Sequence, residues 1–225
     1  MKFNDSISNI ILSAGIVLTT ATQLRLINYP IGPGEILLFL WLIMSIISLF
    51  RSGRIFVPPV AEILIYFWGS SSILLFVGWL VAQNLGLSDE STYHTALSFL
   101  FVAILIIIFT LKAGVKERIQ KTVQLIFIFS SIPLAFLLLY GFLYNKIGPV
   151  ELWYYGVRFT GWSVNPNQLA LLVVMIPFIG FNLLKQGNTF SKKIKILYGF
   201  LSLFSIFVGI ITILFVLLHS LFIHD

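Results

Sequence analysis

Long apolar runs of membrane-spanning length constrain the fold of this chain more than any other feature. Each run is near the ~20 residues that an α-helix needs to cross a bilayer. The runs are Ser8–Ile27, Glu35–Phe50, Pro59–Ala82, Thr95–Leu111, Thr122–Tyr144, Gln168–Leu184 and Ile196–Leu218. They lack the in-out alternation of barrel strands, and a helix pairs all its own backbone polar groups inside lipid. The sequence therefore predicts an all-α, polytopic transmembrane bundle of about seven spans, forming a single transmembrane domain over residues 1–225.

Composition supports an integral membrane protein and excludes several functional classes. Hydrophobic residues make up 59% of the chain and charged residues only 10%, whereas soluble domains carry about 25% charged residues. Cysteine is absent, which excludes disulfides, thiolate metal sites and a cysteine nucleophile. The net charge of +6 does not indicate a nucleic-acid partner, because the basic residues lie in short loops between apolar runs. The expected surroundings are membrane lipids.

The distribution of lysine and arginine predicts the orientation. If successive loops alternate between the two sides, all 14 basic residues except Arg25, Lys146 and Arg158 fall on one side. By the positive-inside rule that side is cytoplasmic. The N-terminus is then inside, and the C-terminus and the loop over residues 145–167 are outside, which is the periplasm in a bacterium. The first span has no clear cleavage pattern, so we expect it to be retained.

The outer loop over residues 145–167 carries the candidate site. Pro149–Gly156 is expected to form a short interfacial helix, with Glu151 near its positive end. Asn165 suits the N-cap and Pro166 the first position of the next helix. A helix start beside an arginine, here Arg158, attracts phosphate, which a guanidinium can hold through two hydrogen bonds.

Ordinary structural roles explain the same loop about equally well. Arg158 could pair with Glu151 or with a lipid phosphate, and Asn165 could be a simple helix cap. The aromatic residues of the loop could form an interfacial belt, as is common in membrane proteins. The residues alone leave both interpretations open.

A resemblance to a known family favours the functional interpretation. The loop resembles the arginine, glycine and Asn-Pro-Asn signature of the O-antigen ligase and O-antigen polymerase superfamily, which are multi-spanning glycosyltransferases of the bacterial inner membrane. The matching residues read Arg158-Phe-Thr-Gly161-Trp162-Ser-Val-Asn165-Pro166-Asn167. The resemblance in motif extends over about Tyr155 to Ala170.

This resemblance implies an activity, partners and site residues. Family members transfer a glycan from a polyprenyl-diphosphate carrier to an acceptor glycan or lipid core on the periplasmic face, without a metal or other cofactor. Arg158 would be the catalytic residue that stabilises the departing diphosphate. Gly161, Trp162, Asn165 and Asn167 would form the substrate-binding part of the loop.

The chain also departs from the family pattern. Family members have more spans, a large periplasmic loop with further arginines, and a histidine that matters for activity. His94, His219 and His224 match no such motif, and their spacing does not indicate a metal site either. We therefore expect this chain to correspond to the front part of a family member. In this form it is expected to show weak or no glycosyl transfer.

Two other hypotheses remain open. One is a small transporter or membrane scaffold subunit centred on Glu62 or on helix kinks at Pro133 and Pro177, since intramembrane carboxylates are often functional. Glu62 is equally well explained as a residue at headgroup depth. The other is a non-catalytic protein that only binds the polyprenyl-linked glycan.

Arg25 and Glu35 flank a tight turn and are expected to form a structural ion pair.

Overall fold

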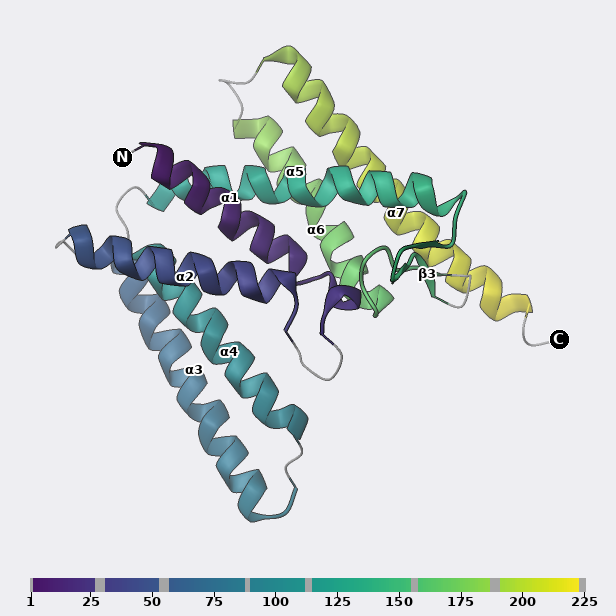
Figure 1. Cartoon of the computed structure of the whole chain (residues 1–225). Helices are drawn as coiled ribbons and strands as arrows, with labels where there is room; N and C mark the ends of the chain where they lie inside the picture. Colours follow the sequence, from purple (N-terminus) through teal and green to yellow (C-terminus); the bar gives the residue numbers. More distant parts are fainter. Residues whose placement is uncertain are drawn as a thin grey trace. The chain divides into compact units, whose positions relative to one another are not determined.

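The computed structural model describes residues 2–26, 31–52, 57–87, 90–111, 115–154, 158–186 and 191–222 (Figure 1). Seven α-helices form over these residues: α1 Lys2–Leu18, α2 Pro33–Ser52, α3 Pro59–Asn84, α4 Glu90–Thr110, α5 Val115–Gly141, α6 Pro166–Gln186 and α7 Lys192–Phe222. A 3-10 turn, η1, spans Thr22–Leu24. Two small hairpins pair β1 Lys146–Ile147 with β2 Val150–Glu151, and β3 Trp153–Tyr154 with β4 Arg158–Phe159.

The predicted all-α membrane architecture is confirmed. In the described part of the chain, six helices are long and apolar enough to cross a membrane, namely α2 to α7. The second span is longer than its apolar run suggested, because α2 has 20 residues and rises about 30 Å at 1.5 Å per residue. Which end faces the cytoplasm stays a prediction.

The first helix is shorter than predicted. The expected span Ser8–Ile27 is wrong at its C-terminal end, because α1 stops at Leu18 and its apolar part covers only Ser6–Leu18. The Thr19 and Thr20 hydroxyls donate to the carbonyls of Ile16 and Val17, at 2.7 Å in both cases. Such local hydrogen bonds compete with continuation of a helix. The polar segment after Leu18 is thereby free to turn into η1.

The chain divides into two compact units, which we describe separately. The first comprises Met1–Phe39 and Ile119–Asp225, and the second Leu40–Arg118. In the first unit, apolar residues of α5, α6, α7 and the hairpins share one buried core. Its largest fully buried side chains include Phe127, Leu134, Leu152, Phe159 and Ile176. The candidate loop is thus continuous with the packed interior of this unit.

Small residues allow the helices of the first unit to approach closely. A methyl group added at Gly180 on α6 would meet the Ser202 hydroxyl of α7 and the Phe127 ring of α5. Ser202 and its neighbour Ser205 are buried, and their hydroxyls donate to carbonyls one turn earlier in α7, at 2.7 and 2.9 Å. Close packing of small residues with satisfied hydroxyls is how helices associate in lipid, where neighbouring chains are as apolar as the helix itself.

The second unit contains the antiparallel pair α3 and α4 (Figure 1). Rings from the two helices meet near the middle of the pair and near its connecting loop, with centroids 4.7 Å apart for Trp68 and Phe99 and 5.3 Å apart for Trp79 and Tyr93. Beyond this contact, α3 presents exposed apolar side chains along its length, including Ile63, Phe67, Leu74 and Val81. Such a surface suits a lipid environment.

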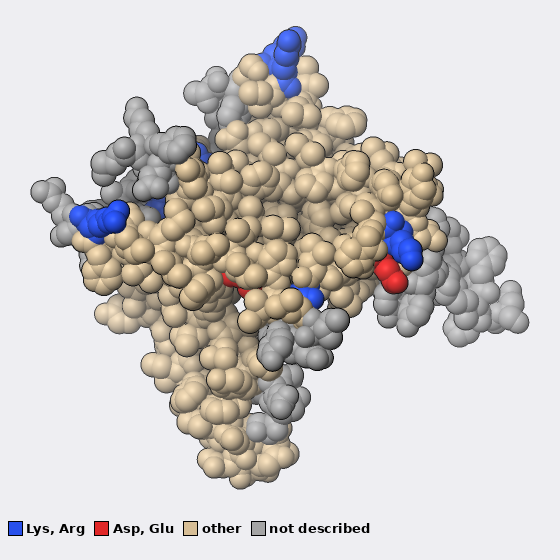
Figure 2. Space-filling model, in the orientation of Figure 1, with Lys and Arg blue, Asp and Glu red and all other residues tan. Residues whose placement is uncertain are grey.

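Charged side chains are sparse on the visible surface. Figure 2 shows mostly uncharged atoms, with lysine, arginine and acidic residues at a few separated places. This distribution agrees with a chain in which only 10% of residues are charged. Ligand recognition by charge is therefore confined to few positions.

Candidate functional site

The loop between α5 and α6 is built from hairpins. The interfacial helix expected over Pro149–Gly156 is wrong, because Val150–Glu151 and Trp153–Tyr154 are strands; Tyr155 and Gly156 lie outside the described residues. Gly148, with φ of 55°, opens the two-residue turn of the first hairpin, a position that favours glycine. Aromatic residues in the second hairpin favour strands over helix.

The second hairpin fixes the backbone of Arg158. Trp153 pairs with Phe159, and Tyr154 pairs with Arg158. Phe159 is fully buried, and its ring meets Trp153 edge-on at 5.5 Å. The Trp153 indole Nε1 donates to the Gly141 carbonyl at the end of α5, at 2.8 Å. The side chain of Arg158 lies outside the described residues, so its contacts stay a prediction.

Gln23, in η1, joins the N-terminal segment to this loop. Its Nε2 donates to the carbonyls of Glu151 at 2.7 Å and Ser163 at 2.9 Å. Its Oε1 accepts a 2.6 Å hydrogen bond from the Glu151 amide. The backbone amide of Gln23 also donates to the Trp162 carbonyl at 3.2 Å. One side chain therefore connects both ends of the loop to the end of α1.

Gln23 was not predicted as a site residue. It lies near the end of the expected first span Ser8–Ile27, where a glutamine following three threonines is unexpected. That cluster of hydrogen-bonding side chains in an apolar run was the available signal, because polar groups at such positions are usually paired.

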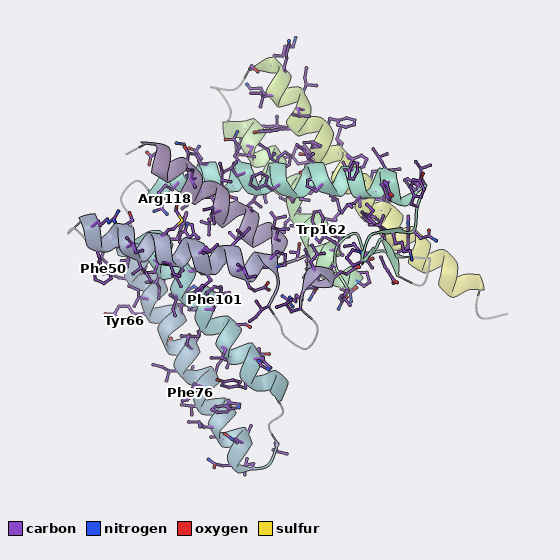
Figure 3. All side chains as sticks on the ribbon, in the orientation of Figure 1. Phe50, Tyr66, Phe76, Phe101, Arg118 and Trp162 are labelled. Carbon is purple, nitrogen blue, oxygen red and sulfur yellow. The ribbon has the colours of Figure 1, made fainter. Side chains whose placement is uncertain are left out.

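Gly161 and Trp162 form a tight turn that is held in place. Gly161 has φ of 57°, a conformation that residues with a Cβ rarely adopt. Trp162, labelled in Figure 3, is only 8% exposed. Its indole Nε1 donates to the Thr20 hydroxyl at 2.8 Å. With the ring buried and its only donor engaged, stacking on a sugar would require Trp162 to leave this position.

The start of α6 is capped as predicted. Asn165 precedes the first helical residue, Pro166, and its Oδ1 accepts a 2.9 Å hydrogen bond from the Asn167 amide. The Asn165 carbonyl accepts the amide of Gln168 at 3.1 Å and the hydroxyl of Ser163 at 3.0 Å. Asn165 and Asn167 are both exposed, so their side chains are accessible from solvent.

The residues named in the ion-pair and transporter hypotheses lie in ordinary structural positions. The predicted ion pair is confirmed: Arg25 Nη2 lies 2.6 Å from Glu35 Oε1. Glu62 is exposed in the first turn of α3, and Pro133 and Pro177 lie inside α5 and α6. Within the residues that the structure describes, no group of three or more potential ligand side chains is placed to hold a metal ion.

Two open cavities border η1. The first, of about 330 Å³, is lined by Gln23, Pro149, Glu151, Trp153, Thr160 and Val164. The second, of about 370 Å³, lies between the end of α1 and the start of α6. The first cavity borders the hairpins that carry the candidate motif.

No protein-family model, curated protein or solved structure matches this chain. Helix length and hydropathy establish a multi-pass helical membrane protein.

Proposed function

We propose that this protein binds a polyprenyl-diphosphate-linked glycan at the loop over residues 145–167 and belongs functionally to the O-antigen ligase and polymerase type of surface-polysaccharide assembly. The observation that carries the proposal is the arginine, glycine and Asn-Pro-Asn motif lying on one hydrogen-bonded loop that directly precedes a membrane-length helix. Arg158 lies in β4, Gly161 forms the turn, and Asn165 caps α6. A bacterial inner membrane with this loop on the periplasmic face is the corresponding location.

The chemistry of the donor explains why such a loop suits it. In glycosyl transfer the bond between the anomeric carbon and the phosphate oxygen breaks, and an acceptor hydroxyl oxygen bonds to that carbon and releases its proton. The departing diphosphate gains negative charge, which a fixed guanidinium stabilises in the transition state. Arg158 would supply that charge. A motif held at a helix start, next to lipid, suits a donor that is itself anchored in lipid.

The packing of the described part of the loop supports the proposal further. Leu152 and Phe159 are fully buried, and the Thr160 hydroxyl donates to the Glu151 carbonyl at 2.9 Å. Groups that are oriented before a ligand arrives lose little conformational entropy on binding. The adjacent cavity of about 330 Å³ gives space for the head of the donor, with Asn165 and Asn167 exposed nearby in sequence. The acceptor glycan or lipid core would approach from the same side.

The test is binding of polyprenyl diphosphate to the purified protein in nanodiscs. Arg158→Ala is expected to raise the dissociation constant about 10- to 100-fold, because the charge-assisted hydrogen bonds to phosphate are lost. Arg158→Lys is expected to fall between alanine and wild type, because lysine keeps the charge but not the bidentate geometry. Calorimetric or mass-spectrometric titration measures both.

The matched control is Lys146→Ala, which removes the exposed lysine of β1 in the same loop. It is expected to leave diphosphate affinity close to wild type. Equal binding by Arg158→Ala and wild type would contradict the proposal. Substrate uptake that is lost in Glu62→Gln and retained in Arg158→Ala would favour a transporter instead.

A further inference from the structure

The second cavity combines polar groups with an apolar wall. It is an open cavity of about 370 Å³, and its lining residues all belong to the first unit. Its lining residues are Thr19, Thr20, Thr22, Arg25, Gln168, Leu171, Leu172 and Met175. The polar members come from the segment after α1 and from the first turn of α6, and the apolar members come from the following turns of α6.

Hydrogen-bond donors are left over at the polar end. Gln168 Oε1 lies 3.4 Å from the Thr22 hydroxyl and 3.1 Å from the Ser163 hydroxyl, whose one proton it shares with the Asn165 carbonyl. The Nε2 group of Gln168 donates to nothing within the described chain, although Gln168 lines the cavity. Arg25 Nη2 bonds to Glu35, and the Arg25 side chain, which also lines the cavity, keeps 33% of its surface exposed. Arg25 Nε is buried and has no partner among the described residues, but it has no surface open to the cavity.

The apolar wall continues from the polar end along one face of α6. Gln168, Leu171, Leu172 and Met175 follow the spacing i, i+3, i+4 and i+7, which places them on the same helix face. Leu171 is 72% and Met175 is 60% exposed. In a membrane-spanning helix this face would lie against hydrocarbon, with the amide of Gln168 at the depth of the lipid headgroups. The cavity therefore has the polarity profile of a lipid molecule.

We propose that this cavity binds a membrane glycerophospholipid, with its phosphodiester accepting hydrogen bonds from Gln168 Nε2 and the Arg25 guanidinium. One acyl chain lies along Leu171, Leu172 and Met175. The Arg25 charge is already paired with Glu35, so the site has no net positive charge to offset a diphosphate. A phosphodiester with one negative charge meets less repulsion from Glu35 there. This site adjoins the glycan-donor site proposed above, because Gln168 follows Asn167 at the start of α6, but the proposal does not depend on that site.

Gln168→Glu tests the proposal without removing the structural contacts of this residue. The carboxylate keeps an oxygen for the Thr22 and Ser163 hydroxyls, and an acidic residue in the first turn favours the helix. It replaces the free amide donor by a negative charge that repels phosphate. Native mass spectrometry with phosphatidylglycerol is expected to show one saturable site in wild type and about tenfold or more weaker binding in Gln168→Glu.

The control variant is Gln83→Glu, which adds the same charge at an exposed position of α3. It is expected to bind phosphatidylglycerol like wild type, and all three proteins are expected to unfold at similar temperatures. Diacylglycerol, which lacks the phosphate, is expected to bind weakly. The proposal is overturned if Gln168→Glu binds like wild type, if diacylglycerol binds equally well, or if inorganic phosphate alone occupies the site.

Discussion

Replacing Gln23 by alanine is expected to release the loop over residues 145–167 from the end of α1. The substitution removes the donors to the carbonyls of Glu151 and Ser163 and the acceptor for the Glu151 amide. The Glu151 carbonyl keeps the Thr160 hydroxyl as a donor, and each lost hydrogen bond contributes about 0.5–1.5 kcal/mol to stability. We expect a corresponding loss in the free energy of unfolding, together with weaker binding of the glycan donor. Chemical unfolding in detergent measures the first effect.

Hydrogen exchange locates the effect of Gln23→Ala within the chain. The Glu151 amide is expected to exchange faster, because its acceptor is gone. The Val164 amide, which donates to the Thr22 hydroxyl at 2.8 Å, is expected to change less. Gln83→Ala is the control, since Gln83 is exposed near the end of α3. Unchanged exchange at Glu151 in Gln23→Ala would contradict the role that we assign to Gln23.

Gly180→Ala is expected to destabilise the first unit strongly for so small a change. The added methyl group would meet the Ser202 hydroxyl and approach within 2.7 Å of a carbon of the Phe127 ring. Both neighbours are buried in helices packed around α6, so the helices must separate or the ring must move. Overpacking of this kind costs about 1–3 kcal/mol. The loss appears as a lower unfolding midpoint in detergent.

Gly69→Ala is the matched control for Gly180→Ala. Gly69 also lies inside a helix, α3, but a methyl group there meets no atom within 4 Å. Alanine has a higher helix propensity than glycine, by about 1 kcal/mol. Gly69→Ala is therefore expected to be neutral or stabilising. Equal stability of the two variants would show that α5, α6 and α7 are not packed as described.

The helices were predictable from the sequence because lipid imposes a simple rule. Runs of about 20 apolar residues must be helical to satisfy their backbone, and the bounds of α3 and α6 agree closely with the predicted spans. The start of α6 was predictable for a local reason, since Asn165 and Pro166 each suit one position of a helix cap. The ion pair of Arg25 and Glu35 followed from their positions beside a tight turn.

The outer loop could not be predicted in the same way. Pro149 and Glu151 suit a helix start, but the segment forms hairpins because Leu152 and Phe159 are buried in the core of the first unit. That preference depends on contacts with residues distant in sequence. Gln23 was missed for the same reason, since its partners lie 128 and 140 residues away. Trp162 was predictable as part of the motif, but its buried position was not.

Cysteine labelling tests most directly whether Arg158 lies on a loop at the non-cytoplasmic surface. The chain has no native cysteine. Val164 is 58% exposed in the loop and Ser191 is exposed before α7, whereas Ser163 is fully buried and unsuitable. In intact cells, a membrane-impermeant maleimide is expected to label Val164→Cys, and Ser191→Cys only after lysis. Labelling of Ser191→Cys alone, or of both in intact cells, would contradict the account.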